Sequence, residues 1–154
     1  GMLELEGRAP VEVPALVSGV DIVGIVHDHP IGVSAEGRLG PWPPDARRAT
    51  DGFAPEPDEL AVALHRTHEA LPDAVLAVAG HGVPTDDDAW HDHLIARSLD
   101  RVQEAVADIG LAGYFHDSGV DGYEWALGFG ARRGLLRRDR TRRPAATTFA
   151  SAAG

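Results

Sequence analysis

Three short apolar segments alternate with two long stretches of helical periodicity along this chain of 154 residues. The apolar segments Val20–His27, Ala74–Gly80 and Leu111–His116 are bounded by Gly, Pro or Asp, which is typical of short buried strands. Apolar side chains recur every three or four residues over Glu56–Leu71 and Asp87–Ile109, which predicts two amphipathic helices. The order strand, helix, strand, helix, strand predicts parallel strands joined by right-handed crossovers.

The second helix carries sequence signals for both of its ends. The acidic run Asp86–Asp88 stands at its start, where carboxylates suit the unpaired amides and the helix dipole. Gly110 follows its last residue, where glycine commonly ends a helix. The tail from Pro144 is rich in Ala and Thr and predicts one further short helix.

Two other segments have less regular patterns. A Gly- and Pro-rich loop runs from Pro30 to Pro57, and a loop of this length is usually functional or covers a partner. Within it, Ala35–Arg38 is a candidate hairpin turn. The N-terminal stretch Leu3–Val17 is a candidate for an additional strand.

Composition limits the class of protein. The net charge of −10 favours solubility and argues against a nucleic-acid partner. There are no cysteines, so disulfides and thiolate metal sites are excluded. We find no apolar run long enough for a membrane span and no signal peptide, and we expect a cytoplasmic protein without a cofactor. Gly1 before Met2 resembles the remnant of a tag, and residues 2–154 are expected to form a single domain.

The basic residues are unevenly distributed. All fourteen are arginines, and seven of them fall between Arg132 and Arg143. One interpretation is a solvated basic face that offsets the acidic body of the protein. The other is a site for phosphate or for an acidic partner.

The stretch Gly113–Asp139 contains Gly-Tyr-Phe-His-Asp-Ser, then Tyr-Glu-Trp, then Arg-Arg-Gly-Leu-Leu. It resembles the C-terminal signature of family 1 glycoside hydrolases, the β-glucosidase family, which reads Gly-Tyr-Phe-x-Trp-Ser, Phe-Glu-Trp and Arg-Phe-Gly-Leu. The segments Asp21–Ile25, Thr50–Phe53, Pro57–Leu60 and Ala74–Pro84 resemble earlier motifs of the same family in the same order.

The resemblance covers only about the last third of a family member, so the first five strands of the family's barrel have no counterpart. It implies an α/β fold, a partial (β/α)8 TIM-type barrel equivalent to the last three βα units. Three parallel strands cannot close a barrel, and their edges and faces would be left unpaired. We therefore expect completion by oligomerisation, most economically as a homodimer, with a complementing chain as the alternative.

The resemblance also implies that the catalytic carboxyl groups are absent. A retaining glycosidase needs two of them, about 5 Å apart. Gly80 stands where the family has its nucleophilic Glu, and the acid/base Glu of the family's Asn-Glu-Pro motif belongs to a missing strand. Asp117 replaces the Trp on which the sugar stacks. We therefore expect a protein that is inactive as a glycosidase, with His81 and Asp117 as weak catalytic candidates.

Glu124 and Trp125 match the family's Glu that binds two sugar hydroxyls and the Trp beside it. One interpretation is a retained carbohydrate site formed by Glu124 and Trp125 with His27 and His116 around them. The other is a structural remnant in which Trp125 belongs to the core and Glu124 pairs with an arginine such as Arg132 or Arg133.

The three predicted strands end in His27, His81 and His116, and the C-terminal ends of parallel strands face one site. With Asp117, Asp121 and Glu124, three imidazoles could ligate Zn²⁺ or perform acid/base chemistry. Solvated or hydrogen-bonded histidines at the strand ends are the interpretation that we favour. Three function classes follow: a β-glucosidase-like pseudoenzyme that binds a sugar or a glycosylated small molecule, a hydrolase or metal-dependent enzyme using these side chains, and a scaffold or complementing fragment.

Overall fold

The computed structural model describes residues 2–3, 7, 9–12 and 20–153, with a three-stranded parallel sheet at its centre. The sheet is formed by β3 (Ile22–Val26), β6 (Val75–His81) and β7 (Leu111–His116), in the order β3–β6–β7. Both neighbouring pairs are parallel. The β3–β6 register shifts once, between Ile25 and Val26, and the β6–β7 register shifts between Leu76 and Val78 and again between Val78 and His81. The predicted strands and their parallel arrangement are confirmed, with ends that differ by at most two residues.

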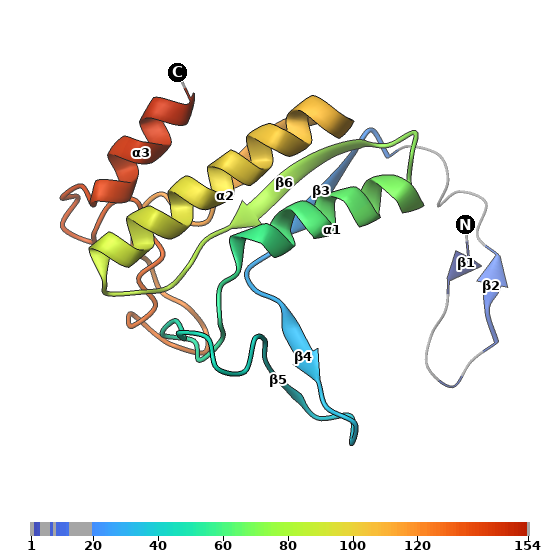
Figure 1. Cartoon of the computed structure of the whole chain (residues 1–154), viewed down its shortest axis with the longest axis horizontal. Coiled ribbons are helices and arrows are strands. Elements are labelled where there is room, and N and C mark those ends of the chain that lie inside the picture. The colour runs from blue at the N-terminus through green and yellow to red at the C-terminus, as the bar shows by residue number, and fades with distance from the viewer. Residues whose placement is uncertain (1, 4–6, 8, 13–19, 154) are drawn as a thin grey trace.

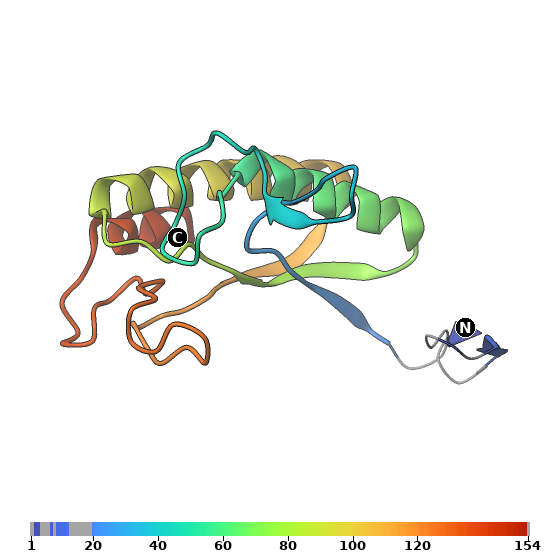
Figure 2. The same ribbon diagram turned by 90° about the horizontal axis from the view of Figure 1, so that it is seen from below.

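Two long helices and one short one lie on the same face of this sheet (Figures 1 and 2). They are α1 (Pro57–Ala70), α2 (Asp88–Ile109) and α3 (Pro144–Ala153), so all three predicted helices are confirmed. The amphipathic faces of α1 and α2 turn towards β6, because apolar side chains gain free energy when they leave water. This contact forms the main core, which contains Leu60, Leu64, Val78, Val102 and Ala105.

The ends of α2 form as the sequence predicts. The Asp87 side chain accepts a hydrogen bond from the backbone N–H of Trp90, at 2.9 Å between Oδ1 and N. At the other end, Gly110 adopts a left-handed φ of 68° and donates its N–H to the carbonyl of Val106. Glycine suits that conformation because it has no Cβ.

The long loop before α1 contains a hairpin of β4 (Ile31–Val33) and β5 (Leu39–Pro41), paired antiparallel. The backbone N–H of Ser34 donates to the Arg38 carbonyl, which closes a turn over residues 35–37 and confirms the predicted hairpin.

The N-terminal stretch forms a separate antiparallel pair, β1 (Met2–Leu3) with β2 (Val11–Glu12), so its described part adds no strand to the main sheet. Residues 4–6, 8 and 13–17 of that candidate strand lie outside the described residues.

No described helix covers the other face of the sheet, as Figure 2 shows. The described strands therefore form an open α/β sheet with parallel strands, and no closed barrel is seen among them. Completion by an oligomer stays a prediction. Within the described part of the chain, none of the helices has the length and apolar character needed to cross a membrane.

Candidate functional site

The parallel strands bring the predicted histidines to one edge of the sheet. The ring centres of His27 and His81 lie 6.0 Å apart, at the ends of β3 and β6. His116 ends β7, and its backbone pairs in register with that of His81. The three imidazoles nevertheless have different environments, and these environments decide what each can do.

The His81 side chain is buried on the helical side of the sheet, with 2% of its surface exposed. Its Nδ1 is hydrogen-bonded to the carbonyl oxygen of His27, and its Nε2 lies 2.8 Å from the hydroxyl oxygen of Ser98 on α2. Burial lowers the pKa of His81 to about 4, so the imidazole is neutral at pH 7. In the neutral ring Nδ1–H donates to the His27 carbonyl, and Nε2 faces the Ser98 hydroxyl, whose single proton also has the Leu94 carbonyl as an acceptor at 2.9 Å. Both nitrogens therefore face groups inside the protein.

His27 and His116 are partly buried, and burial lowers the pKa of each. The Nε2 of His116 is hydrogen-bonded to the Arg133 carbonyl at 3.0 Å, while Nδ1 of either ring has no described partner. Across residues 20–153, no three His, Asp or Glu side chains are arranged to hold a metal ion. The weak metal site suggested for His27, His81 and His116 therefore gains no support from the geometry.

Gly80 faces the uncovered side of the sheet. A Cβ placed there would lie 3.6 Å from the methyl groups of Val26 and 3.9 Å from Cβ of Asp117. Asp117 is exposed, and its backbone N–H donates to the carbonyl of His81. Asp117 is therefore the carboxylate next to the position that the nucleophilic Glu occupies in the resemblance, and within residues 20–153 it forms no ion pair.

Arg133 organises the carboxylates at this edge, and 8% of its surface is exposed. Its guanidinium nitrogens lie 3.1 Å from Asp28, 3.6 Å from Asp51 and 3.5 Å from Glu124. Its Nη1 also donates to the carbonyl of Gly82 at 3.1 Å. In the sequence, Arg133 replaces the Phe of the Arg-Phe-Gly-Leu motif. Its pair with Glu124 agrees with the interpretation that Glu124 pairs with an arginine such as Arg132 or Arg133, whereas its contacts with Asp28 and Asp51 were not predicted. We call Asp28, Asp51, Glu124 and Arg133 the strand-end ion cluster.

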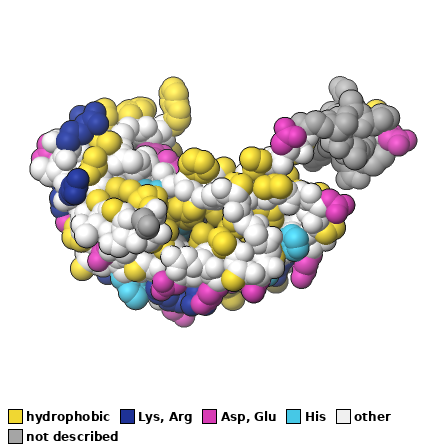
Figure 3. All heavy atoms as spheres, turned by 90° about the horizontal axis from the view of Figure 1, so that it is seen from above, with side chains coloured by type: hydrophobic (Ala, Val, Ile, Leu, Met, Phe, Trp, Pro, Cys, Tyr) yellow, Lys and Arg dark blue, Asp and Glu magenta, His cyan; other side chains and the backbone are white. Residues whose placement is uncertain are grey.

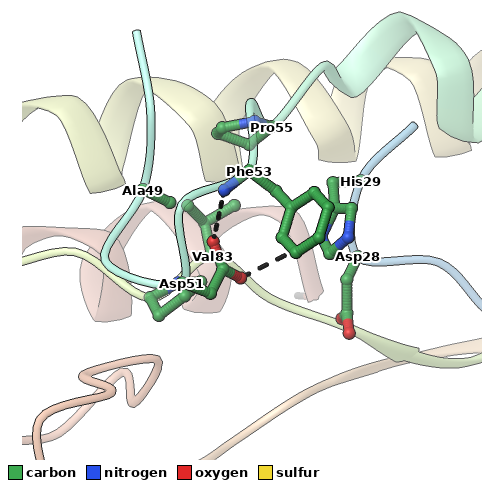
Figure 4. A pocket seen from close by; sticks show the side chains of 8 residues that line it. Asp28, His29, Ala49, Asp51, Phe53, Pro55 and Val83 are labelled. Carbon is green, nitrogen blue, oxygen red and sulfur yellow. Dashed lines mark hydrogen bonds and ion pairs between the residues drawn. The ribbon is translucent and has the colours of Figure 1, made fainter. Parts of the chain in front are cut away.

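Asp51 connects a neighbouring loop to this cluster through Arg133, and Figure 4 shows its contacts with Phe53 and His29. Its Oδ1 accepts the backbone N–H of Phe53 at 3.1 Å, and its Oδ2 lies 3.9 Å from Nδ1 of His29. The His29 ring stacks on Phe53 with 3.9 Å between ring centres. These side chains close the space between them, so this part of the edge has a structural role and leaves no room for a ligand.

Glu124 and Trp125 open a tight turn after β7. The backbones of Glu124 and Gly128 exchange hydrogen bonds of 2.8 and 2.7 Å, which places Trp125 near the tip. Trp125 is 95% exposed, so the interpretation that it belongs to the core is wrong. Tyr123 packs edge-on against both Trp125 and Phe129, at centre distances of 6.1 and 5.2 Å. We call Tyr123, Trp125 and Phe129 the exposed aromatic cluster.

A hollow of about 300 Å³ lies beside this cluster. Phe129 forms one wall, with the guanidinium of Arg138 3.9 Å from the centre of its ring. Sequence reasoning did not identify this hollow. The remaining side chains around it are Asp121, Arg132, Arg137 and Asp139, so both donors and acceptors of hydrogen bonds line it.

Four of the seven arginines between residues 132 and 143 hold carboxylates of the same chain. Arg132 pairs with Asp86, and Arg137 and Arg143 both pair with Asp88, while Arg133 serves the strand-end ion cluster. The basic segment therefore partly neutralises carboxylates in the rest of the same chain. The other three, Arg138, Arg140 and Arg142, have no carboxylate partner among the described residues.

No protein-family model matches the chain, and no curated protein sequence matches it. Solved structures do. The apo structure of a β-glucosidase, 1317, is 29% identical, with 86% of this chain and 34% of that chain covered at a TM-score of 0.75. A β-glycosidase from Pyrococcus horikoshii is 23% identical, covering 99% and 38%, with a TM-score of 0.80. A family 1 β-glucosidase from Thermotoga maritima is 17% identical, covering 88% and 34%, with a TM-score of 0.73.

The chain therefore has the fold of part of a family 1 β-glucosidase, and it spans about a third of the length of these structures. This agrees with the resemblance noted in the sequence. The fold identifies the chain as a family 1-like partial glycosidase unit, while activity and ligands depend on the side chains at its site.

Proposed function

We propose that this chain is a β-glucosidase-like protein that has no retaining glycosidase activity by itself and that binds a carbohydrate or a glycosylated small molecule. The observation that carries the proposal is the exposed indole of Trp125, next to Glu124, in a chain with glycine at the nucleophile position. Both residues match sugar-contacting residues of the family that the chain resembles.

The lack of hydrolysis follows from the carboxyl groups. A retaining glycosidase needs a nucleophile and an acid/base on opposite sides of the glycosidic bond. Gly80 offers no side chain, and the sequence contains no counterpart of the strand that would bring the acid/base. Asp117 is adjacent to Gly80, but one carboxylate cannot perform both roles. Glu124 lies 3.5 Å from Arg133 and is held as an ion-paired carboxylate.

Binding is supported by the surface around Trp125. Exposed aromatic side chains that gather in one place usually mark an interaction site. Tyr123, Trp125 and Phe129 are 61%, 95% and 52% exposed, and their rings offer apolar faces of the size of a sugar ring. The Glu124 carboxylate and the polar groups around the adjacent hollow supply hydrogen-bonding partners for hydroxyls.

A hydrolase or metal-dependent enzyme at the strand ends is less well supported. Such chemistry needs an imidazole whose nitrogens reach the substrate or the ion. Both ring nitrogens of His81 lie within hydrogen-bonding distance of protein groups, the His27 carbonyl and the Ser98 hydroxyl. Its low pKa keeps the imidazole neutral, but the buried ring cannot reach a substrate or an ion. Analysis of the metal content of the purified protein tests this alternative directly.

The carbohydrate proposal is tested by calorimetric titration of simple glycosides, alongside tryptophan fluorescence. Trp125→Ala should abolish binding, and Glu124→Gln should weaken it about ten- to a hundredfold, because one charged hydrogen-bonding partner contributes about 1.5–3 kcal/mol. Trp42→Ala is the matched control, since Trp42 is also exposed but directly follows β5, away from the exposed aromatic cluster in the sequence. If the wild type gives no heat with any glycoside, carbohydrate binding is refuted. If Glu124→Gln only lowers the melting temperature, Glu124 is structural.

A further inference from the structure

The face of the sheet opposite the helices carries a row of exposed apolar side chains. Ile22 and Val26 of β3 are 54% and 70% exposed, Val75 of β6 is 50% exposed, and Phe115 of β7 is 64% exposed. They share a face because side chains alternate along a strand. Their neighbours Ile25 and Val78 belong to the core under the helices. Figure 3, a view at a right angle to that of Figure 1, shows hydrophobic side chains gathered in a hollowed part of the surface.

The middle of this face is recessed below the side chains around it, because its residues are glycine and alanine. A Cβ on Gly24 would come within 2.8 Å of Cβ of Ala79, so these two residues lie against each other on neighbouring strands. A Cβ on Gly113 would face the ring of Phe115 on β7 at 3.7 Å. The face therefore has a shallow trough at Gly24 and Ala79, with the Phe115 ring projecting to one side. We call this surface the open sheet face.

The extent of exposed surface is large for a protein of this size. The chain exposes 9609 Å², whereas a compact monomer of 16.3 kDa is expected to expose about 7,500 Å². The excess is about 2,100 Å², part of which belongs to the N-terminal β1–β2 pair that stands away from the body (Figure 1). A stable interface needs about 800 Å² from each partner, which is less than half of this total excess.

Parallel sheets are almost always covered on both faces, which makes an uncovered face of this kind an interface. We propose that a second copy of this chain covers the open sheet face in a twofold dimer. In such a dimer each surface must be complementary to itself. The open sheet face meets this condition because it carries both a projecting ring and a trough, so Phe115 of each copy can enter the trough at Gly24 and Ala79 of the other.

The proposal is tested by light scattering and sedimentation on the wild-type chain and on variants of the face. The wild type should be a dimer at micromolar concentration. Phe115→Asp should be a monomer, because it places a charge in the apolar contact. Val62→Asp is the matched control, since Val62 is exposed on α1 on the far side of the sheet, and it should stay dimeric.

Ala79→Phe provides a second variant that adds no charge. It fills the trough, so it should also give a monomer while its circular dichroism remains that of the wild type. The proposal is overturned by a wild-type monomer with cooperative unfolding, or by a dimer that survives both Phe115→Asp and Ala79→Phe. It is equally overturned if the chain becomes soluble only with a different polypeptide that contributes βα units. Carbohydrate binding is independent of these outcomes, because the exposed aromatic cluster lies outside the open sheet face.

Discussion

The guanidinium of Arg133 lies 3.5 Å from the carboxylate of Glu124, so the residue that matches a sugar-binding Glu is ion-paired within its own chain. Glu124 remains 38% exposed at its side chain, whereas the side chain of Arg133 is 10% exposed. The pair therefore has a buried cationic end and an accessible anionic end. Arg133 holds Glu124 in place from behind, while the outer face of the carboxylate remains available to a hydroxyl group.

Arg133→Met should destabilise the protein by roughly 3–5 kcal/mol, because it leaves the carboxylates of Asp28, Asp51 and Glu124 without their shared cation. Urea unfolding at pH 7 measures this difference in the free energy of unfolding. Arg138→Met is the control, since Arg138 lies exposed over Phe129 and should lose about 1 kcal/mol or less. Equal losses for the two variants would show that the strand-end ion cluster does not depend on Arg133.

Neither the wild type nor Gly80→Glu should hydrolyse an aryl β-glucoside. A Cβ at position 80 would meet Val26 and Asp117 at ordinary contact distances of 3.6 and 3.9 Å, so the backbone there accepts a side chain. A retaining mechanism still lacks an acid/base on the opposite side of the sugar. Release of a β-configured sugar by either protein, above the level of a Gly80→Gln control, contradicts this expectation.

The regular elements could be predicted from the sequence because their signals are local. The spacing of apolar residues identified α1 and α2, and Asp87 and Gly110 identified the ends of α2. Motif order along the chain identified the partial glycosidase fold that the solved structures share. Signals of both kinds can be read along the chain, because they depend on residues close in sequence or on the order of segments.

The site was harder to predict because its contacts join distant segments. Arg133 meets Asp28 and Asp51 across about a hundred residues, and no spacing rule links an arginine in one loop to carboxylates in two others. The solvent exposure of Trp125 could not be predicted either, because a Glu-Trp pair is compatible with both a core and a surface position. The turn that Glu124 closes with Gly128 decides that Trp125 points into solvent.

Stability should fall as the pH is lowered from about 6.5 towards 4. Burial lowers the pKa of His81 to about 4 from an ordinary value of 6.5, so in this window the unfolded chain binds a proton that the folded chain does not. Its contribution is fully present above pH 6.5 and is lost at about 1.4 kcal/mol per pH unit within the window. His27, His91 and His116, whose pKa values are also lowered, act in the same direction.

Urea unfolding at pH 7.5, 6.5 and 5.5 measures this pH dependence. His81→Asn keeps a donor near the His27 carbonyl but removes the titrating ring, so its slope should be smaller by up to about 1.4 kcal/mol per pH unit. His93→Asn replaces an imidazole at an exposed position on α2 and is the control. Identical slopes for the wild type and His81→Asn would show that the buried imidazole is not responsible.

Gly80, near the end of β6, and Gly82, directly after it, should differ strongly in how much stability they lose on substitution by alanine. A Cβ on Gly82 would lie 1.7 Å from the carbonyl oxygen of Asp117, and because that atom is backbone, no change of rotamer can relieve the contact. Gly82→Ala should therefore lose about 3 kcal/mol or more. At Gly80 the contacts are ordinary, so Gly80→Ala should change stability by less than about 1 kcal/mol.

The same two variants distinguish effects on packing from effects on ligand binding at this edge of the sheet. Gly82 also offers the carbonyl that Arg133 binds, so moving its backbone should disturb the strand-end ion cluster as well as Asp117. Unfolding curves and glycoside titrations on Gly82→Ala and Gly80→Ala give both readouts. If Gly82→Ala is as stable as Gly80→Ala, the backbone of Asp117 does not pack against the end of β6. If Gly82→Ala loses stability as expected, the close approach of the Asp117 backbone requires glycine at position 82, whereas packing does not require glycine at position 80.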